Sequence, residues 1–108
     1  MEAPHAECPL SPCIRPLSGA WTLEIIYYLR QGALHFGELR RSLGSVSSKV
    51  LTTRLRELEG NKVIERRVME GNPPRVEYRL SELGAELLPV RDAFSSVSAK
   101  LRRQYHVA

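Results

Sequence analysis

Apolar residues recur every three or four positions in several stretches of the chain, the spacing that places them on one face of an α-helix. The first stretch follows Ser18 and has Gly32 as its expected end. A shorter second stretch is closed by Gly44. The third begins at Ser47, whose hydroxyl can accept a hydrogen bond from a free amide of the first turn, and runs to about Glu59. The apolar positions of these three predicted helices are Trp21, Ile25, Tyr28 and Leu29, then Phe36, Leu39 and Leu43, then Leu51, Leu55 and Leu58.

After the third predicted helix the helical spacing gives way to alternation. A β-compatible run over 63–69 is followed by the turn-forming segment 70–74, which contains glycine, asparagine and two prolines. Beyond it, Val76, Tyr78 and Leu80 alternate with charged residues. This part of the chain is predicted to form a two-stranded hairpin.

A last helix is predicted from Ser81, which serves as its N-cap. Pro89 should kink this helix, because proline cannot donate the hydrogen bond to the carbonyl of Ala85. The apolar positions are spaced 4, 3, 4, 3 and 4 residues apart, a pattern typical of a helix that packs along a partner, and are Leu83, Leu87, Val90, Phe94, Val97 and Leu101. We expect dimer contacts from Leu83, Leu87, Phe94, Val97 and Leu101. The alternative is that the helix folds back on its own domain.

The order of the predicted elements indicates the fold. A helix, a short helix, a turn, a helix and a hairpin make a winged helix-turn-helix, an α+β fold that is mainly α, here with a two-stranded wing and a C-terminal dimerisation helix. We divide the chain into an irregular proline-rich arm (1–17), a DNA-binding core (18–80) and the C-terminal helix (81–108).

The polar side of the third predicted helix carries candidate chemistry. Lysine and arginine can bond guanine edges or phosphates, and threonine offers a hydroxyl and a methyl group that can meet thymine. A solvated surface helix would show the same residues, but the preceding turn and the following basic hairpin favour a surface for double-stranded DNA. The predicted DNA-binding residues are Ser47, Ser48, Lys49, Thr52, Thr53 and Arg56, with Arg75 on the hairpin.

The predicted hairpin is itself basic, with Arg66 and Arg67 on one strand and Arg75 and Arg79 on the other. A rigid basic ribbon suits a DNA groove or the phosphate backbone. The same arginines would also keep an exposed edge strand soluble. Both interpretations stay open for Arg66 and Arg79, whereas the place of Arg75 beside the turn favours DNA contact.

Composition agrees with a soluble domain that has a polyanionic partner. The 108 residues are 43% hydrophobic and 26% charged, with a net charge of +4. The longest apolar run, Ile25 to Leu29, is too short to span a membrane, and the first ten residues lack the pattern of a signal peptide. We therefore expect a cytoplasmic protein without membrane contact.

Short segments along most of the chain resemble the HxlR-type winged-helix transcription regulators. These segments are Cys8–Leu10, Leu17–Leu23, His35–Leu39, Val46–Thr52, Leu55–Glu59 and Pro73–Leu80, the last of which is highly specific. The resemblance extends from Cys8 to about Val90 and implies a dimeric bacterial or archaeal DNA-binding regulator. The chain departs from the family at Ala20, where a lysine is usual, and at His35, where an arginine is usual.

The resemblance also implies a role for Cys8, which lies thirteen residues ahead of Trp21. Many family members carry a cysteine at that position, and in the redox-responsive members its thiol is the switch. Cys13 is an additional thiol and a candidate partner in oxidation. The alternative is that both cysteines pack the arm on the core. A metal site made with His5 would have only three ligands, without the spacing of a zinc knuckle.

Motifs for catalysis are lacking in the sequence. It has no glycine-rich phosphate loop, no paired histidines at metal-binding spacing and no nucleophile elbow, so we expect neither an enzyme nor a cofactor. The two isolated histidines His35 and His106 are interpreted as surface or capping residues. The alternative to a DNA-binding regulator is a thiol-based sensor or protein-interaction module that keeps the fold but does not bind DNA.

Overall fold

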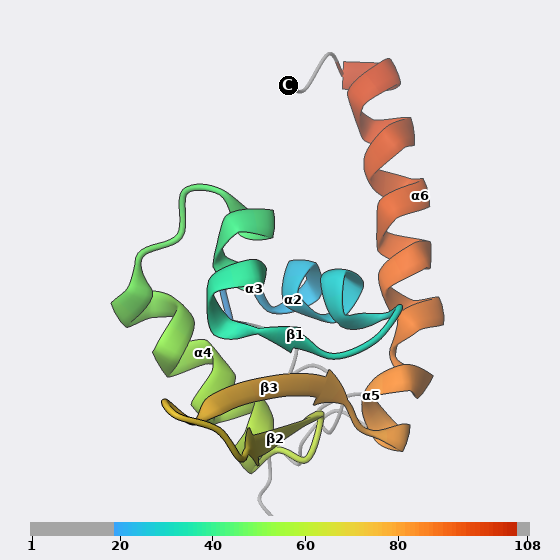
Figure 1. Ribbon diagram of the computed structural model, residues 1–108. Coiled ribbons are helices and arrows are strands. Elements are labelled where there is room, and N and C mark those ends of the chain that lie inside the picture. The colour runs from blue at the N-terminus through green and yellow to red at the C-terminus, as the bar shows by residue number, and fades with distance from the viewer. Residues whose placement is uncertain (1–18, 106–108) are drawn as a thin grey trace, which may run out of the picture.

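The computed structural model of the protein describes residues 19–105 (Figure 1). The helices in this part of the chain are α2 (Thr22–Leu29), α3 (Phe36–Leu43), α4 (Ser48–Gly60), α5 (Glu82–Glu86) and α6 (Leu88–Tyr105), and the strands are β1 (Leu34–His35), β2 (Ile64–Met69) and β3 (Arg75–Leu80). The helix α6 projects beyond the other elements (Figure 1). The element order confirms the predicted winged helix-turn-helix.

The sheet has one strand more than the predicted hairpin. Its order is β1-β3-β2, with both pairings antiparallel. The short strand β1 lies beside β3, where Leu34 is opposite Tyr78 and His35 is opposite Glu77. Two residues show no alternation that a sequence pattern could reveal, so β1 exists only through this long-range pairing.

The first described helix, α2, is shorter than the spacing predicted. It begins after Trp21, whose backbone is left-handed with φ 71°, and the expected cap, Ser18, lies outside the described residues. At the other end, the backbone N–H and the guanidinium of Arg30 both donate to the carbonyl oxygen of Tyr27, at 3.2 and 2.9 Å. The helix ends at Leu29, and Gly32, the predicted stop, follows three residues later with its N–H donating to the Leu29 carbonyl oxygen at 3.2 Å.

The turn between α3 and α4 is held by hydrogen bonds from both sides. Gly44 follows α3 with φ 85°, a backbone conformation that favours glycine. The hydroxyl oxygen of Ser47 accepts the N–H of Val50 at 3.1 Å and caps α4. Arg40 Nε donates to the Val46 carbonyl at 3.2 Å across the turn. The predicted stop at Gly44 and cap at Ser47 are both confirmed.

His35 occupies the N-cap position of α3, as the capping interpretation predicted. Its backbone N–H donates to Glu38 Oε1 at 2.8 Å. This hydrogen bond favours the ionised carboxylate and lowers the pKa of Glu38. The start of α3 is thereby fixed at the point where β1 ends.

The core lies between α2, α3, α4 and the base of the hairpin. The leucine face of α4 is fully buried and meets apolar side chains from the other elements. Each such side chain contributes roughly 1.5–3 kcal/mol by leaving water. The buried residues are Ile25, Ile26, Leu29, Leu39, Leu43, Val46, Leu51, Leu55, Leu58, Val63, Ile64 and Leu87.

The C-terminal part of the chain forms two helices that break at Leu87, two residues before Pro89, where a kink within one helix was predicted. The first, α5, ends at Glu86, and α6 starts at Leu88. Pro89 lies in the first turn of α6, where an N–H would have no partner within the helix and nothing is lost by its absence. The break places Leu87 in the core, with only 7% of its surface exposed.

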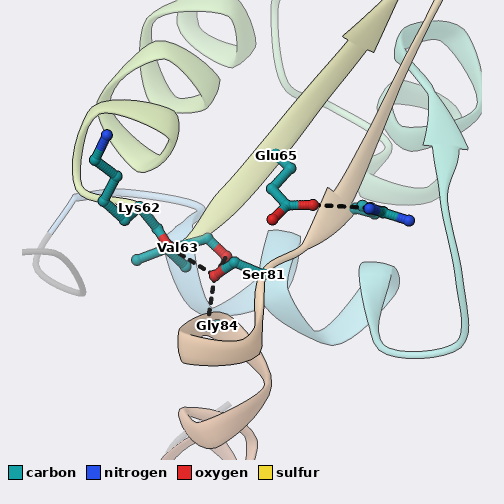
Figure 2. Close-up of polar contacts among 6 residues, drawn as sticks. Lys62, Val63, Glu65, Ser81 and Gly84 are labelled. Atoms are coloured by element: carbon teal, nitrogen blue, oxygen red, sulfur yellow. Dashed lines mark hydrogen bonds and ion pairs between the residues drawn. The ribbon is translucent and has the colours of Figure 1, made fainter.

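A junction at Ser81 joins the end of α4, the base of the hairpin and α5 (Figure 2). The Ser81 hydroxyl oxygen accepts the Gly84 N–H at 2.9 Å, as predicted for an N-cap. The same oxygen lies 2.6 Å from the Lys62 carbonyl and 3.0 Å from the Val63 carbonyl, and its proton can be donated to either. The backbone N–H of Ser81 also donates to Val63, at 3.0 Å.

Tyr27 attaches α6 to α2. The guanidinium of Arg91, on α6, lies 4.0 Å from the centre of the Tyr27 ring, and that of Arg30 lies 3.9 Å from it. The Tyr28 ring packs edge-on against Tyr27 at 5.2 Å. Cation–π contacts of this kind contribute about 0.5–1 kcal/mol at exposed sites and help to set the direction in which α6 leaves the core.

The replacement Gly84→Ala is expected to destabilise the protein by about 3 kcal/mol, at the upper end of typical overpacking costs. An added Cβ would overlap the Val63 carbonyl oxygen, which is backbone and cannot rotate away. Gly60→Ala is the matched control, because a Cβ there meets nothing within 4 Å. Urea unfolding of both variants measures the difference. An equal effect of the two replacements would contradict the close contact at Gly84.

Candidate nucleic-acid interface

The polar face of α4 presents most of the predicted DNA-binding residues to solvent. Lys49, Thr53 and Arg56 are exposed, and Thr52 is half-buried on the side of the helix that faces the hairpin. The Thr53 hydroxyl donates to the Lys49 carbonyl at 3.0 Å, which holds the side chain against its own helix. Ser48, the first residue of α4, is also exposed. The arrangement offers two cations without an ion pair among residues 19–105, and two threonine side chains, on one helix.

The hairpin has two chemically different faces, which its register defines. Arg66 is opposite Tyr78, and both belong to the face that continues into the core through Ile64 and Leu80. Alternation along a strand places Arg67 on the other face.

Acidic partners compensate the outer face of the hairpin. Arg79 Nε lies 2.9 Å from Glu65 Oε1, and the two residues are directly opposite each other. Arg67 is opposite Glu77, whose carboxylate is also 4.0 Å from His35 Nε2. Of the two arginines that the sequence left undecided, Arg79 is therefore the one engaged in an ion pair.

Arg75 stands at the tip of the wing, as its predicted role requires. It is the first residue of β3, is exposed, and lies opposite Met69. No ion pair is recorded for Arg75 within residues 19–105. Its cation is available to a partner that approaches the tip.

A pocket of about 440 Å³ lies between α2 and α6, and another of about 320 Å³ lies between α4 and the hairpin. The second pocket is lined by Thr52, Arg56, Glu59, Arg66 and Tyr78. Only two of these residues were predicted as site residues. The sequence did not predict that Arg66 and Tyr78 lie together beside α4, because this depends on the register of the two strands. The alternation along the hairpin showed only that Tyr78 lies on the same face as the apolar residues.

Four of the five residues predicted to form dimer contacts are accessible. Leu83, Phe94, Val97 and Leu101 are 46–56% exposed, which is unusual for large apolar side chains. Leu87 is the exception, because it packs in the core of its own protomer. Phe94, Val97 and Leu101 are spaced three and four residues apart and so share one side of α6.

The remaining predicted site residues cannot be placed. Cys8 and Cys13, like His5 and His106, lie outside the described residues. Across residues 19–105, no three histidine, cysteine or acidic side chains come together as a metal site would require. No helix in the described part of the chain has the length and apolar character needed to cross a membrane.

Known proteins with similar sequences and structures are transcription regulators. An uncharacterised HTH-type transcriptional regulator of Methanothermobacter thermautotrophicus is 36% identical over 86 residues, which cover 80% of this chain and 66% of that protein. The chain thus spans just under two thirds of that relative's length.

Solved structures support the same grouping. The HTH-type transcriptional regulator ytcD superposes with a TM-score of 0.84 and 33% identity, covering 91% of this chain and 100% of the other. The redox regulator HypR in its oxidised form superposes with a TM-score of 0.80 and 32% identity, covering 86% of this chain and 96% of the other. The family model for HxlR-like helix-turn-helix proteins matches residues 16–105. The chain belongs to the HxlR-like helix-turn-helix family.

Proposed function

We propose that this protein is a non-enzymatic transcription regulator that binds double-stranded DNA in a sequence-specific manner. The observation that carries the proposal is the polar face of α4, on which Lys49, Thr53 and Arg56 are exposed beside a turn held by α3. The helix has 13 residues, and at about 1.5 Å per residue it fits the major groove. Membership of a helix-turn-helix family supports the same activity.

The roles of α4 and the wing follow from their chemistry. We assign base reading to Lys49, Thr52, Thr53 and Arg56, because these side chains can bond base edges, and we assign Ser47 and Ser48 to the DNA-facing start of the helix. Arg75 at the wing tip is assigned to the phosphate backbone. We assign DNA binding to residues 18–80 and dimerisation to residues 81–108. We expect both to take place in the cytoplasm.

We propose that the protein acts as a homodimer. The exposed apolar stripe formed by Phe94, Val97 and Leu101 lies on α6, which projects beyond the other elements (Figure 1). A second copy of the same stripe would bury it in a self-complementary contact. Two-fold pairing would set the two recognition helices about 34 Å apart, one turn of DNA, and require an inverted-repeat operator.

A second proposal concerns regulation by oxidants or electrophiles. Its support is the structural likeness to HypR, a redox regulator described in both an oxidised and a reduced form. Cys8 in the 1–17 arm is the proposed reactive thiol, and Cys13 is its proposed partner in a disulfide. Oxidation would change the size and polarity of the arm and so the spacing of the two recognition helices.

Removing the Arg56 side chain is expected to reduce sequence discrimination. Arg56→Ala should weaken operator binding about 5- to 150-fold more than random-duplex binding, because a base-edge contact contributes about 1–3 kcal/mol of discrimination. Arg75→Ala should weaken both to a similar degree, since a phosphate contact is blind to sequence. Fluorescence anisotropy with an operator selected from genomic fragments measures both variants. Equal losses on the two duplexes for Arg56→Ala would remove Arg56 from the reading face.

Placing a charge in the apolar stripe is expected to dissociate the dimer. Val97→Asp should raise the dimer dissociation constant at least about 100-fold, because an unpaired buried charge costs several kcal/mol. Ser96→Asp is the matched control, since it adds the same charge to an exposed position about 100° away on α6. Sedimentation equilibrium measures both variants. Dimers of unchanged stability with Val97→Asp would rule out this stripe as the interface.

Mild oxidant or quinone treatment is expected to change operator affinity about 5- to 150-fold, the usual range of coupling between sites. Cys8→Ser should abolish the response, and Cys13→Ser should abolish it only if a disulfide between the two cysteines is the regulatory form. Anisotropy titrations are run before and after treatment, with mass spectrometry to show modification of the thiol. A fully modified Cys8 with unchanged affinity would leave this cysteine without a regulatory role.

A further inference from the structure

The pocket between α4 and the hairpin collects polar side chains from three separate elements. Thr52, Arg56 and Glu59 are spaced four and three residues apart and so share one side of α4. Arg66 comes from β2 and Tyr78 from β3, where they are directly opposite each other. The residues that line the pocket thus carry two guanidinium groups, two hydroxyls and one carboxylate.

Ion pairs do not neutralise the two arginines of this pocket within the described part of the chain. Among residues 19–105, Arg54, Arg79 and Arg91 each have a carboxylate oxygen within 3.3 Å, whereas no ion pair is recorded for Arg56 or Arg66. Glu59 lines the same pocket, but within residues 19–105 it forms no ion pair with either guanidinium. Two cations and one carboxylate leave a net charge of +1, which matches the single negative charge of a phosphodiester.

The location of the pocket indicates which anion it meets. When α4 lies in the major groove, a hairpin packed beside it lies over a sugar–phosphate strand that borders the groove, because two such strands form the edges of the groove. A pocket between such a helix and hairpin therefore faces the strand.

We infer that this pocket binds one DNA phosphate per protomer, with Arg66 and the Tyr78 hydroxyl as its principal donors. This inference rests on the proposed function, since it requires α4 to enter the major groove. Arg56 lines the same pocket, where its charge attracts the phosphate, and it also remains one of the residues assigned to base reading. The contact fixes the distance between the helix and the wing on the DNA and carries no sequence information itself.

Salt dependence tests the inference, because each phosphate contact contributes about 0.9 to the slope of log K against log salt. Arg66→Ala is expected to lower this slope by about 0.9 per protomer on both the operator and a random duplex. Arg67→Ala is the matched control: it removes the same charge from the next residue, on the opposite face of the hairpin and opposite Glu77. It should change the slope by less than about a third of that amount.

Two further variants separate charge from geometry. Arg66→Lys keeps the charge and should restore the slope. Tyr78→Phe removes only the hydroxyl, so the slope should stay unchanged while affinity for both duplexes falls about 10- to 150-fold, the value of one hydrogen bond to a charged group. Thermal unfolding of each variant confirms that the fold is intact, which the exposure of Arg66 favours.

The outcomes distinguish this inference from the proposed function. A wild-type protein that binds neither duplex would overturn both, and would favour a thiol sensor or protein-interaction module. Steep salt dependence in the wild type with an unchanged slope for Arg66→Ala would overturn only the phosphate pocket. Equal slope changes for Arg66→Ala and Arg67→Ala would also overturn it, because they would show a general effect of net charge.

Discussion

The close contact between Gly84 and the carbonyl oxygen of Val63 is the constraint on which the other elements depend. Only a residue without a Cβ allows α5 to lie this near the strand. At the same point the Ser81 hydroxyl reaches the Lys62 and Val63 carbonyls (Figure 2). One junction therefore sets the end of α4, the base of the hairpin and the start of α5 relative to one another.

Register within the hairpin decides how its charge is used. The hairpin is rich in arginine on both strands, yet the pairing of Glu65 with Arg79 places compensating acids on the outer face. The face toward α4 keeps Arg66 beside Tyr78 without such a partner among the described residues. Arg66 therefore lies on the face toward α4 and Arg75 lies at the tip of the wing, where under the proposed function a DNA backbone would contact them.

The attachment of α6 links the proposed dimer contact to the proposed reading surface. Leu87 anchors the start of the C-terminal segment in the core, and Arg91 lies against the Tyr27 ring of α2. The exposed stripe begins only beyond these contacts, at Phe94. A change in how two copies meet along α6 would therefore rotate or shift each DNA-binding unit as a rigid body. Oxidation of the proposed regulatory thiol would have to produce such a rigid-body motion.

Local patterns in the sequence were sufficient to predict the parts of the structure that depend on residues close together in the chain. The leucine spacing of α4, its Ser47 cap, the Gly44 stop and the two hairpin strands depend on periodicity and turn chemistry within a few residues, so the sequence alone predicted them. The sequence also identified the family, through short segments such as Pro73–Leu80.

Contacts between distant residues decided the rest. The strand β1 exists because Leu34 meets Tyr78, and Leu87 is buried because the chain breaks before Pro89 and turns that side chain toward the core. Alternation along the strand already placed Arg79 on the outer face, but only the cross-strand register sets it opposite Glu65 and sets Arg66 opposite Tyr78. Only the tertiary structure could therefore bring Arg66 and Tyr78 to α4, because the hairpin and the helix meet through packing and not through a local pattern in the sequence.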